Sequence, residues 1–170
     1  YKQRWVEGSH LYAHPMKWIS MLKPAKKVPN THWSSNDPML LKPKTKTLTI
    51  LIIGLWIFGT GDAIIIAAGI GVSPWTVLAQ GITEQINISV GQSTFLVSLF
   101  VLILWIPLKE RPGIGTILNV FIIASAIDIM EPYLPTPEQY IFQIIQVFFG
   151  TILVGVGSGL YLTSNLGPGP

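Results

Sequence analysis

Four long apolar stretches constrain the fold of this chain more than any other feature. They cover residues 48–70, 91–108, 114–130 and 140–162. A helix needs about 20 residues to cross the ~30 Å hydrocarbon core of a bilayer, and each stretch is close to that length. Because the bilayer interior has no water to bind free backbone groups, such segments must form helices rather than open strands. The sequence therefore predicts an all-α membrane protein with four transmembrane helices in this chain.

The composition agrees with a membrane location. Hydrophobic residues make up 49% of the chain and charged residues only 11%, which is far from the balance of a soluble domain. Nine of the eleven Lys and Arg residues lie within residues 1–46, before the first apolar stretch. We interpret this basic segment as a topology signal and expect the partner to be the lipid bilayer, not nucleic acid. The absence of cysteine excludes disulfides and thiolate metal sites.

Residues 1–38 differ from the rest of the chain. They are basic, show no hydrophobic periodicity, and contain no apolar segment of the kind found in a signal peptide. We expect a disordered extension or mis-annotated upstream sequence, followed by a polytopic membrane domain over residues 39–170. His10 and His14 are spaced i, i+4, but they lack a third ligand. The sequence therefore predicts no metal or cofactor.

The segment from Gly150 to Pro170 repeats the segment from Gly54 to Pro74 at an offset of 96 residues (150 − 54). The matched residues of the first copy are Gly54, Gly59, Gly61, Gly71 and Pro74, and those of the second are Gly150, Gly155, Gly157, Gly167 and Pro170. A duplicated glycine-rich helix that ends in Gly-x-x-Pro is typical of a membrane protein built from two halves. We therefore expect this chain to be a fragment in which the second half is incomplete.

Basic residues predict the orientation of the spans. Lys42, Lys44 and Lys46 precede the first span, and Lys109 and Arg111 lie between the second and third. The other two connections, residues 72–90 and 131–139, have neither Lys nor Arg. By the positive-inside rule the N-terminus, the 109–112 turn and the end of the fourth span face the cytoplasm of a bacterial inner membrane. The two repeat copies then run in opposite directions, which predicts an inverted-topology repeat of three-helix units.

The segment that follows the first repeat copy is too short and too polar to span. Ser73 is suited to cap a helix that begins with Pro74, where the missing N–H of proline costs nothing. We expect a helix over about residues 74–84 that lies in the outer interface or re-enters the membrane. Trp75 would anchor it at headgroup level.

Small residues recur every four positions in both repeat copies. The first set is Gly59, Ala63, Ala67 and Gly71, and the second is Gly155, Gly159, Thr163 and Gly167. Each set lines one helix face and permits close approach of another backbone. We favour tight packing of the two helices, against each other across a pseudo-two-fold axis. The alternative is a substrate path lined by backbone.

Asp62 is the most unusual single residue, because it lies near the middle of the first span. A carboxylate there costs about 2.5–3.5 kcal/mol on insertion scales, so it must face the helix bundle or water. Its repeat counterpart is Ser158, so the charge is not part of the repeat. A role in proton or cation coupling is one interpretation; a structural polar group, or a peculiarity of this sequence, is the other.

Four further polar residues at membrane depth complete the candidate transport site: Asn119, Asp128, Gln143 and Gln146. Asn119 is well inside the third span and is expected to hydrogen-bond a neighbouring helix. The others lie toward the outer ends of their spans. We therefore expect Asp128, Gln143 and Gln146 to border one outward-opening cavity together with Asp62.

Three motifs together resemble the YczE/YyaS/YitT family of bacterial integral membrane proteins. They are SPW-x-VL-x-QG from Ser73, WIPL-x-x-RPG-x-GT-x-x-N from Trp105, and GSGLY…LGPGP from Gly157, and the resemblance extends over residues 48–170. It implies a polytopic inner-membrane protein with about two more spans after Gly-Pro-Gly-Pro. The family commonly has an Asp and a His where this chain has Thr76 and Ala79, and an apolar residue at position 62. An activity that depends on that Asp/His pair is therefore not expected here.

Two classes of function fit these features. The first is a transporter or exporter of an unidentified small molecule, with its site between the inverted repeats. The second is a non-transporting accessory protein that supports a membrane-associated enzyme or regulator through the cytoplasmic turn at residues 109–112. The spans carry no His, Cys or paired acids, so we do not expect an enzyme.

Overall fold

The computed structural model describes residues 31–40 and 42–170 of the chain, and within these ranges it is helical and contains no strand. The elements are α1 (Thr45–Ala68), α2 (Pro74–Ile86), α3 (Val90–Leu108), α4 (Ile114–Met130), the 3₁₀ turn η2 (Glu131–Tyr133) and α5 (Tyr140–Ser164). Four helices, namely α1, α3, α4 extended by η2, and α5, are long and apolar enough to cross a membrane. The predicted all-α architecture, with four helices able to span a membrane, is confirmed. His10, His14 and the rest of residues 1–30 lie outside the described residues.

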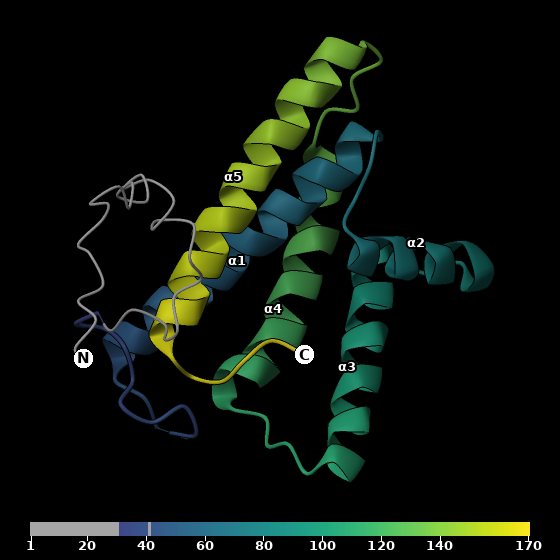
Figure 1. The fold of residues 1–170 in the computed structure, drawn as a ribbon. Coiled ribbons are helices and arrows are strands. Elements are labelled where there is room, and N and C mark those ends of the chain that lie inside the picture. Colours follow the sequence, from purple (N-terminus) through teal and green to yellow (C-terminus); the bar gives the residue numbers. More distant parts are fainter. Residues whose placement is uncertain (1–30, 41) are drawn as a thin grey trace, which may run out of the picture.

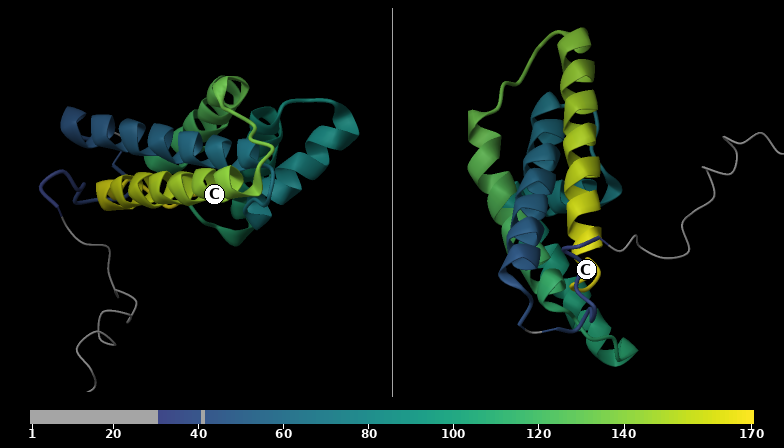
Figure 2. Two further views of the ribbon diagram at one scale, coloured as in Figure 1. Left: turned by 90° about the horizontal axis from the view of Figure 1, so that it is seen from above. Right: turned by 90° about the vertical axis from the view of Figure 1, so that its left-hand side faces the viewer.

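The two repeat copies, α1 and α5, lie side by side along most of their length and run in opposite directions (Figures 1 and 2). They form the most extensive helix–helix contact of the described chain. A Cβ atom on Gly54 would lie 3.1 Å from the carbonyl oxygen of Gly157, and one on Gly61 would lie 2.8 Å from that of Gly150. Glycine thus brings the two backbones into direct contact.

These two contacts are related by the repeat itself. The offset of 96 residues converts Gly54 into Gly150 and Gly61 into Gly157. The contact between Gly54 and Gly157 is therefore the repeat image of the contact between Gly150 and Gly61. Helices α1 and α5 consequently pack across a pseudo-two-fold axis, as the sequence led us to expect.

The residues at this interface differ from those expected. The stripe with a spacing of four does not form it, because contacts occur seven residues apart, which is two helical turns. Gly59 instead faces α4, where its Cβ would lie 2.7 Å from that of Ala126. Gly155 and Gly159 have no neighbouring atom within 4 Å of a Cβ. The spacing-of-four stripe of α5 therefore faces away from α1.

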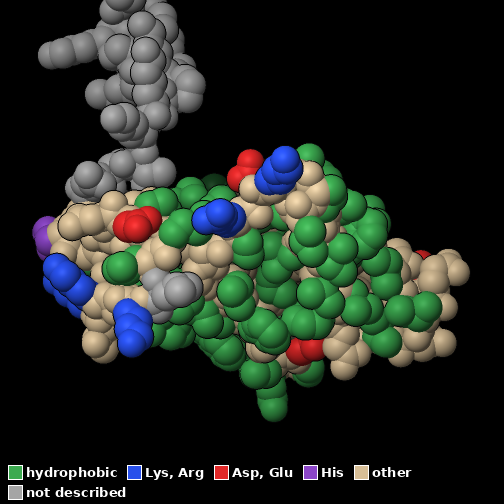
Figure 3. All heavy atoms as spheres, turned by 90° about the horizontal axis from the view of Figure 1, so that it is seen from below, with side chains coloured by type: hydrophobic (Ala, Val, Ile, Leu, Met, Phe, Trp, Pro, Cys, Tyr) green, Lys and Arg blue, Asp and Glu red, His purple; other side chains and the backbone are tan. Residues whose placement is uncertain are grey.

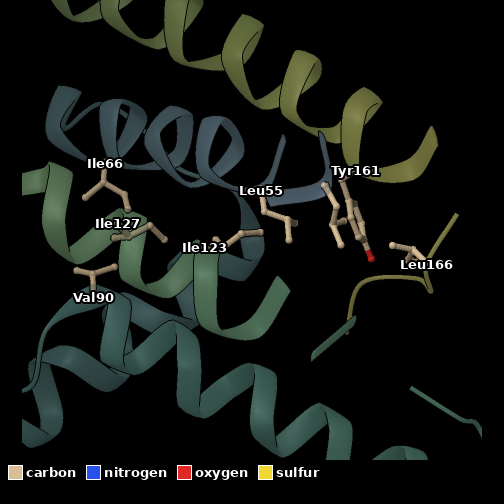
Figure 4. Packing of buried hydrophobic residues seen from close by; sticks show 8 residues of the cluster. Leu55, Ile66, Val90, Ile123, Ile127, Tyr161 and Leu166 are labelled. Atoms are coloured by element: carbon tan, nitrogen blue, oxygen red, sulfur yellow. The ribbon is translucent and has the colours of Figure 1, made fainter. Parts of the chain in front are cut away.

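Helix α4 covers the second face of α1 and completes the core. Leu55 of α1 is fully buried, and Ile123 and Ile127 of α4 belong to the same cluster (Figure 4). The chain after α5 joins this core through Leu166, which is also fully buried and accepts a 2.7 Å hydrogen bond from the backbone N–H of Gly115. The segment that ends the chain is thereby fixed against the start of α4.

A glycine with positive φ follows each repeat helix. Gly71 has φ of 156° and Gly167 has φ of 110°. Residues with a Cβ avoid this region, so both copies need glycine at this turn. The backbone conformation explains why the repeat keeps these two positions.

Helix α2 lies across the direction of the long helices and projects sideways from the bundle (Figure 1). Ser73 caps it by accepting a hydrogen bond from the N–H of Thr76, and Pro74 occupies its first turn, which confirms the expected start. It is tied to α3 by a 2.8 Å hydrogen bond between the hydroxyls of Thr83 and Ser93. Its place relative to the membrane interface stays a prediction.

The described basic residues gather at one end of the bundle. They are Lys42, Lys44, Lys46, Lys109 and Arg111. Figure 3, which looks at this end, shows the Lys and Arg side chains around its rim, with apolar side chains over the neighbouring surface. The segment before α1 is held here by a 2.9 Å hydrogen bond from the N–H of Ser35 to the carbonyl of Ser164.

Candidate functional site

A cavity of about 320 Å³ lies between α1, α5, the first turn of α2, and the facing parts of α3 and α4. The last residues of the chain, Gly169 and Pro170, close one side of it. Most of its wall is apolar, from residues such as Val120, Ile123 and Ile127 of α4. Polar side chains lie between these apolar ones, and Asp62 is the only described lining residue whose side chain has a carboxyl group.

The cavity lies on the pseudo-two-fold axis that relates α1 to α5. Three pairs of its lining residues are related by the offset of 96 residues: Phe58 with Val154, Asp62 with Ser158, and Ser73 with Gly169. A cavity off the axis would be lined by one member of such a pair and not by the other. The walls from α1 and α5 are therefore equivalent in position, although they differ in chemistry.

Asp62 and Asn119 are the two predicted site residues that the structure brings together in this cavity. Asp62 thus faces the bundle, as its cost in lipid requires. No Lys, Arg or His of the described residues lines the cavity beside it. Its carboxyl group has no basic side chain as neighbour there.

Thr94 of α3 also lines the cavity, and its hydroxyl has no hydrogen-bond partner among the described residues. The side chain is only 5% exposed, and its oxygen is a buried atom without a hydrogen bond within the described chain. Burying an unsatisfied polar group costs about 1–3 kcal/mol. This unpaired hydroxyl is a local cost within α3, beside the cavity that Thr94 lines.

Three aromatic side chains also line the cavity. Phe58 of α1, Trp75 of α2 and Tyr161 of α5 line the cavity. The hydroxyl of Tyr161 donates a 2.9 Å hydrogen bond to the carbonyl of Gly167, which fixes both the ring and the C-terminal segment. The aromatic wall is thus held by the end of the second repeat copy.

Thr76 and Ala79, at which the resemblance implies an Asp and a His, differ in location. Thr76 lines the cavity and is 4% exposed, whereas Ala79 is fully buried and does not line it. The hydroxyls of Thr76 and Ser73 lie 2.9 Å apart. The residue at position 76 therefore contributes directly to the cavity wall.

Asp128 does not belong to this cavity. Its carboxylate accepts 2.8 Å hydrogen bonds from the hydroxyl of Ser89 and from the backbone N–H of Gly91. A Cβ on Gly91 would collide with the same carboxylate. Asp128 therefore joins α4 to the start of α3, beside a separate hollow that it lines with Phe95 and Phe121.

Gln143 and Gln146 also have structural roles. Gln143 donates a 2.9 Å hydrogen bond to the carbonyl of Pro137, and Gln146 donates to those of Pro135 (2.9 Å) and Ile64 (3.1 Å). Both thus hold the proline-rich turn onto α5. The expectation that these two glutamines, Asp62 and Asp128 border one cavity is wrong. Asp62, Asp128 and Gln143 line three different hollows, and Gln146 lines none of them.

Several lining residues were not predicted from the sequence, among them Thr94, Ser98 and Tyr161. Thr94 and Ser98 lie one turn apart in an apolar helix, and this spacing was the available signal. Ser158 was identified as the counterpart of Asp62, and its place opposite that residue follows from the pseudo-two-fold axis. The apolar residues of the cavity wall could not be recognised in the sequence, because apolar residues also form the lipid-facing surface of each spanning helix.

Residues 45–170 match the model of a family that is described as a family of unknown function (DUF6198). The chain belongs to this family. It is 41% identical over 150 residues to an uncharacterized protein of Haemophilus influenzae. The aligned residues make up 88% of this chain and 68% of that protein. It is 30% identical to the uncharacterized membrane protein YczE of Bacillus subtilis and 27% identical to the uncharacterized protein YyaS of the same organism.

These relatives confirm the resemblance to YczE and YyaS and the assignment of the chain as a membrane protein. The matches cover 68% and 69% of this chain but only 58% of YczE and 61% of YyaS. The chain thus spans less than two thirds of either Bacillus relative. No solved structure matches the chain.

Proposed function

We propose that this family member transports or exports a small molecule, and that the cavity on the pseudo-two-fold axis is its binding site. The observation that carries the proposal is that three pairs of repeat-equivalent residues line one cavity. Secondary transporters built from inverted repeats bind their substrates at the repeat interface, near the middle of the membrane. A site on the axis can be reached from either side when the two halves rock against each other.

The cavity suggests a small, largely apolar substrate. Its volume of about 320 Å³ is near the lower limit of ligand pockets, which extend over roughly 300–1,000 Å³. The walls carry a single carboxyl group, that of Asp62, with Trp75 and Tyr161 nearby. Aromatic faces and a carboxylate both favour a positive charge, so we infer that the substrate is a compact organic amine.

The distribution of charge supports an orientation in the membrane. The Lys and Arg side chains of the described residues lie at the end where α1 begins and where α3 turns into α4 (Figure 3). Basic residues close to spans stay on the cytoplasmic side. We therefore propose that this end faces the cytoplasm, with the protein in the bacterial inner membrane.

Binding of a compact amine tests the site directly. We would titrate purified protein, in which Trp75 is kept and the other five tryptophans are replaced, with benzylamine and with the uncharged benzyl alcohol, and follow the tryptophan fluorescence. Benzylamine should bind more tightly, and Asp62→Asn should remove the difference. A charge-assisted hydrogen bond contributes about 1.5–3 kcal/mol, so the expected loss is about 10- to 150-fold. Asp128→Asn is the matched control, because that carboxylate lies outside the cavity.

Transport is tested in proteoliposomes with the full-length relative from Haemophilus influenzae and with this chain. Flux of benzylamine that depends on the residue at position 62 would support the proposal. Equal binding of the amine and the alcohol would overturn the substrate class. Absence of any flux, together with loss of a co-purifying protein in the variant Lys109→Ala/Arg111→Ala, would favour the accessory role instead.

A further inference from the structure

One face of α5 is open although the equivalent face of α1 is covered. Leu55 and Ala63 are both fully buried, and Gly59 is packed between them against α4. The repeat counterparts of these three residues on α5 are Thr151, Gly159 and Gly155. Thr151 is exposed, and the two glycines have no atom within 4 Å of a Cβ position. Helix α5 thus has the docking face of α1 without its partner.

The turns that follow the two repeat helices also differ in burial, but here the second copy is covered and the first is open. Leu166, after α5, is fully buried, whereas its counterpart Ile70, after α1, is 39% exposed. A Cβ on Gly167 would lie 2.7 Å from the hydroxyl of Thr116 and 2.9 Å from Gly113, but one on Gly71 would meet nothing within 4 Å. The start of α4 makes the buried contacts in the second copy.

The two open surfaces, around Gly155 and around Gly71, are the repeat counterparts of surfaces that α4 covers. The middle of α4 covers Gly59, and its start covers Gly167. A helix related to α4 by the pseudo-two-fold axis would cover Gly155 with its middle and Gly71 with its start. One helix therefore accounts for two surfaces that lie on different parts of the chain.

We propose that the open face of α5, together with the turn around Gly71, is the docking surface for a second unit built like α2–α4 and inverted with respect to it. The unit belongs to the same polypeptide in this family. The matched relatives YczE and YyaS have 58% and 61% of their length within the match, so each has further residues outside it.

A second copy of this chain does not fit the surface. The docking helix must run opposite to α4, because α5 runs opposite to α1. A second copy inserted by the same basic residues would have its α4 parallel to the first. The occupant also needs a small residue where α4 has Ala126, because glycine at position 155 allows the backbones to approach closely.

Disulfide cross-linking in the full-length Haemophilus relative tests the proposal, after its own cysteines have been replaced. One cysteine replaces the residue aligned with Gly155. The other replaces the expected repeat counterpart of Ala126, which lies 96 residues beyond the position aligned with Ala126. The pair aligned with Gly59 and Ala126 is the positive control, because these Cβ positions are in contact. In the negative control, the first cysteine is placed at the position aligned with Phe149 and not at the one aligned with Gly155. Phe149 lies on another exposed face of α5.

The expected result is an intramolecular disulfide for the test pair, about as efficient as the positive control. A covalent dimer through position 155 would overturn the proposal and identify a second copy as the occupant. Equal cross-linking of the test pair and the Phe149 pair, or no cross-link in the test pair, would also overturn it. None of these outcomes depends on whether the protein transports an amine.

Discussion

Replacing Gly157 by alanine should separate the two repeat helices. The added Cβ would lie 2.5 Å from the backbone nitrogen of Phe58 and 2.6 Å from the carbonyl oxygen of Gly54. Both neighbours are backbone atoms, so no side-chain rotation relieves the contact. An ordinary contact begins at 3.4 Å, and α1 and α5 must therefore move apart by about 0.9 Å (3.4 − 2.5).

A separation of this size is costly, because α1 and α5 form the most extensive contact of the described chain. A gap of 0.5–1 Å forfeits about a quarter to a half of each dispersion contact. Overpacking of a close interface costs about 1–3 kcal/mol. For a chain of this size, that corresponds to a fall in Tm of roughly 2–4 °C for each kcal/mol.

Gly155→Ala is the matched control, two residues away in the same helix. Its Cβ meets nothing within 4 Å, so this variant has only the higher helix propensity of alanine, about 0.8–1 kcal/mol in its favour. The assay is thermal unfolding of the purified 170-residue chain in detergent, followed by tryptophan fluorescence. The reasoning is refuted if Gly157→Ala is as stable as Gly155→Ala.

Three further variants test other parts of the structure by the same thermal unfolding assay. Leu166→Ala should cost about 2–5 kcal/mol, because it empties a fully buried position; a smaller loss than at exposed Leu162 would contradict the packing of the C-terminal turn. Asp128→Ala should cost about 1–3 kcal/mol, because Ser89 and Gly91 lose their acceptor. Thr94→Val should leave the protein as stable or more stable, because it removes an unpaired buried hydroxyl.

The pseudo-symmetry of the cavity has a chemical consequence. Asp62 and Ser158 occupy equivalent positions, so the carboxyl group is offered by one half only. A substrate with a single charged group would then bind in one orientation along the axis. Ser158→Asp would place a second carboxyl group across the cavity and should change which amines bind, with diamines favoured over monoamines.

Much of the architecture was predictable because it depends on short-range rules. The lengths of the apolar stretches determine how many helices can span, and the caps at Ser73 and Ser89 determine where α2 and α3 begin. Both effects act within a few residues along the chain. The repeat likewise indicated that α1 and α5 are antiparallel partners.

The candidate site was predictable only in part, because it depends on the rotation of each helix about its own axis. The sequence placed Asp62, Asn119, Asp128 and Gln146 at membrane depth, but depth does not specify direction. The carboxyl of Asp128 is taken up by the start of α3, and the amide of Gln146 by backbone carbonyls. Such partners come from distant segments and become visible only when the helices are packed.

What the sequence determined by itself was the class of the protein, the number of its spans and the inverted relation of its two copies. These follow from hydrophobic length, basic flanks and an offset of 96 residues. The tertiary structure decided which glycines form the α1–α5 interface and which face is left open on α5. Glycines seven apart and glycines four apart both line helix faces, and only the packed partner shows which of the two faces is buried.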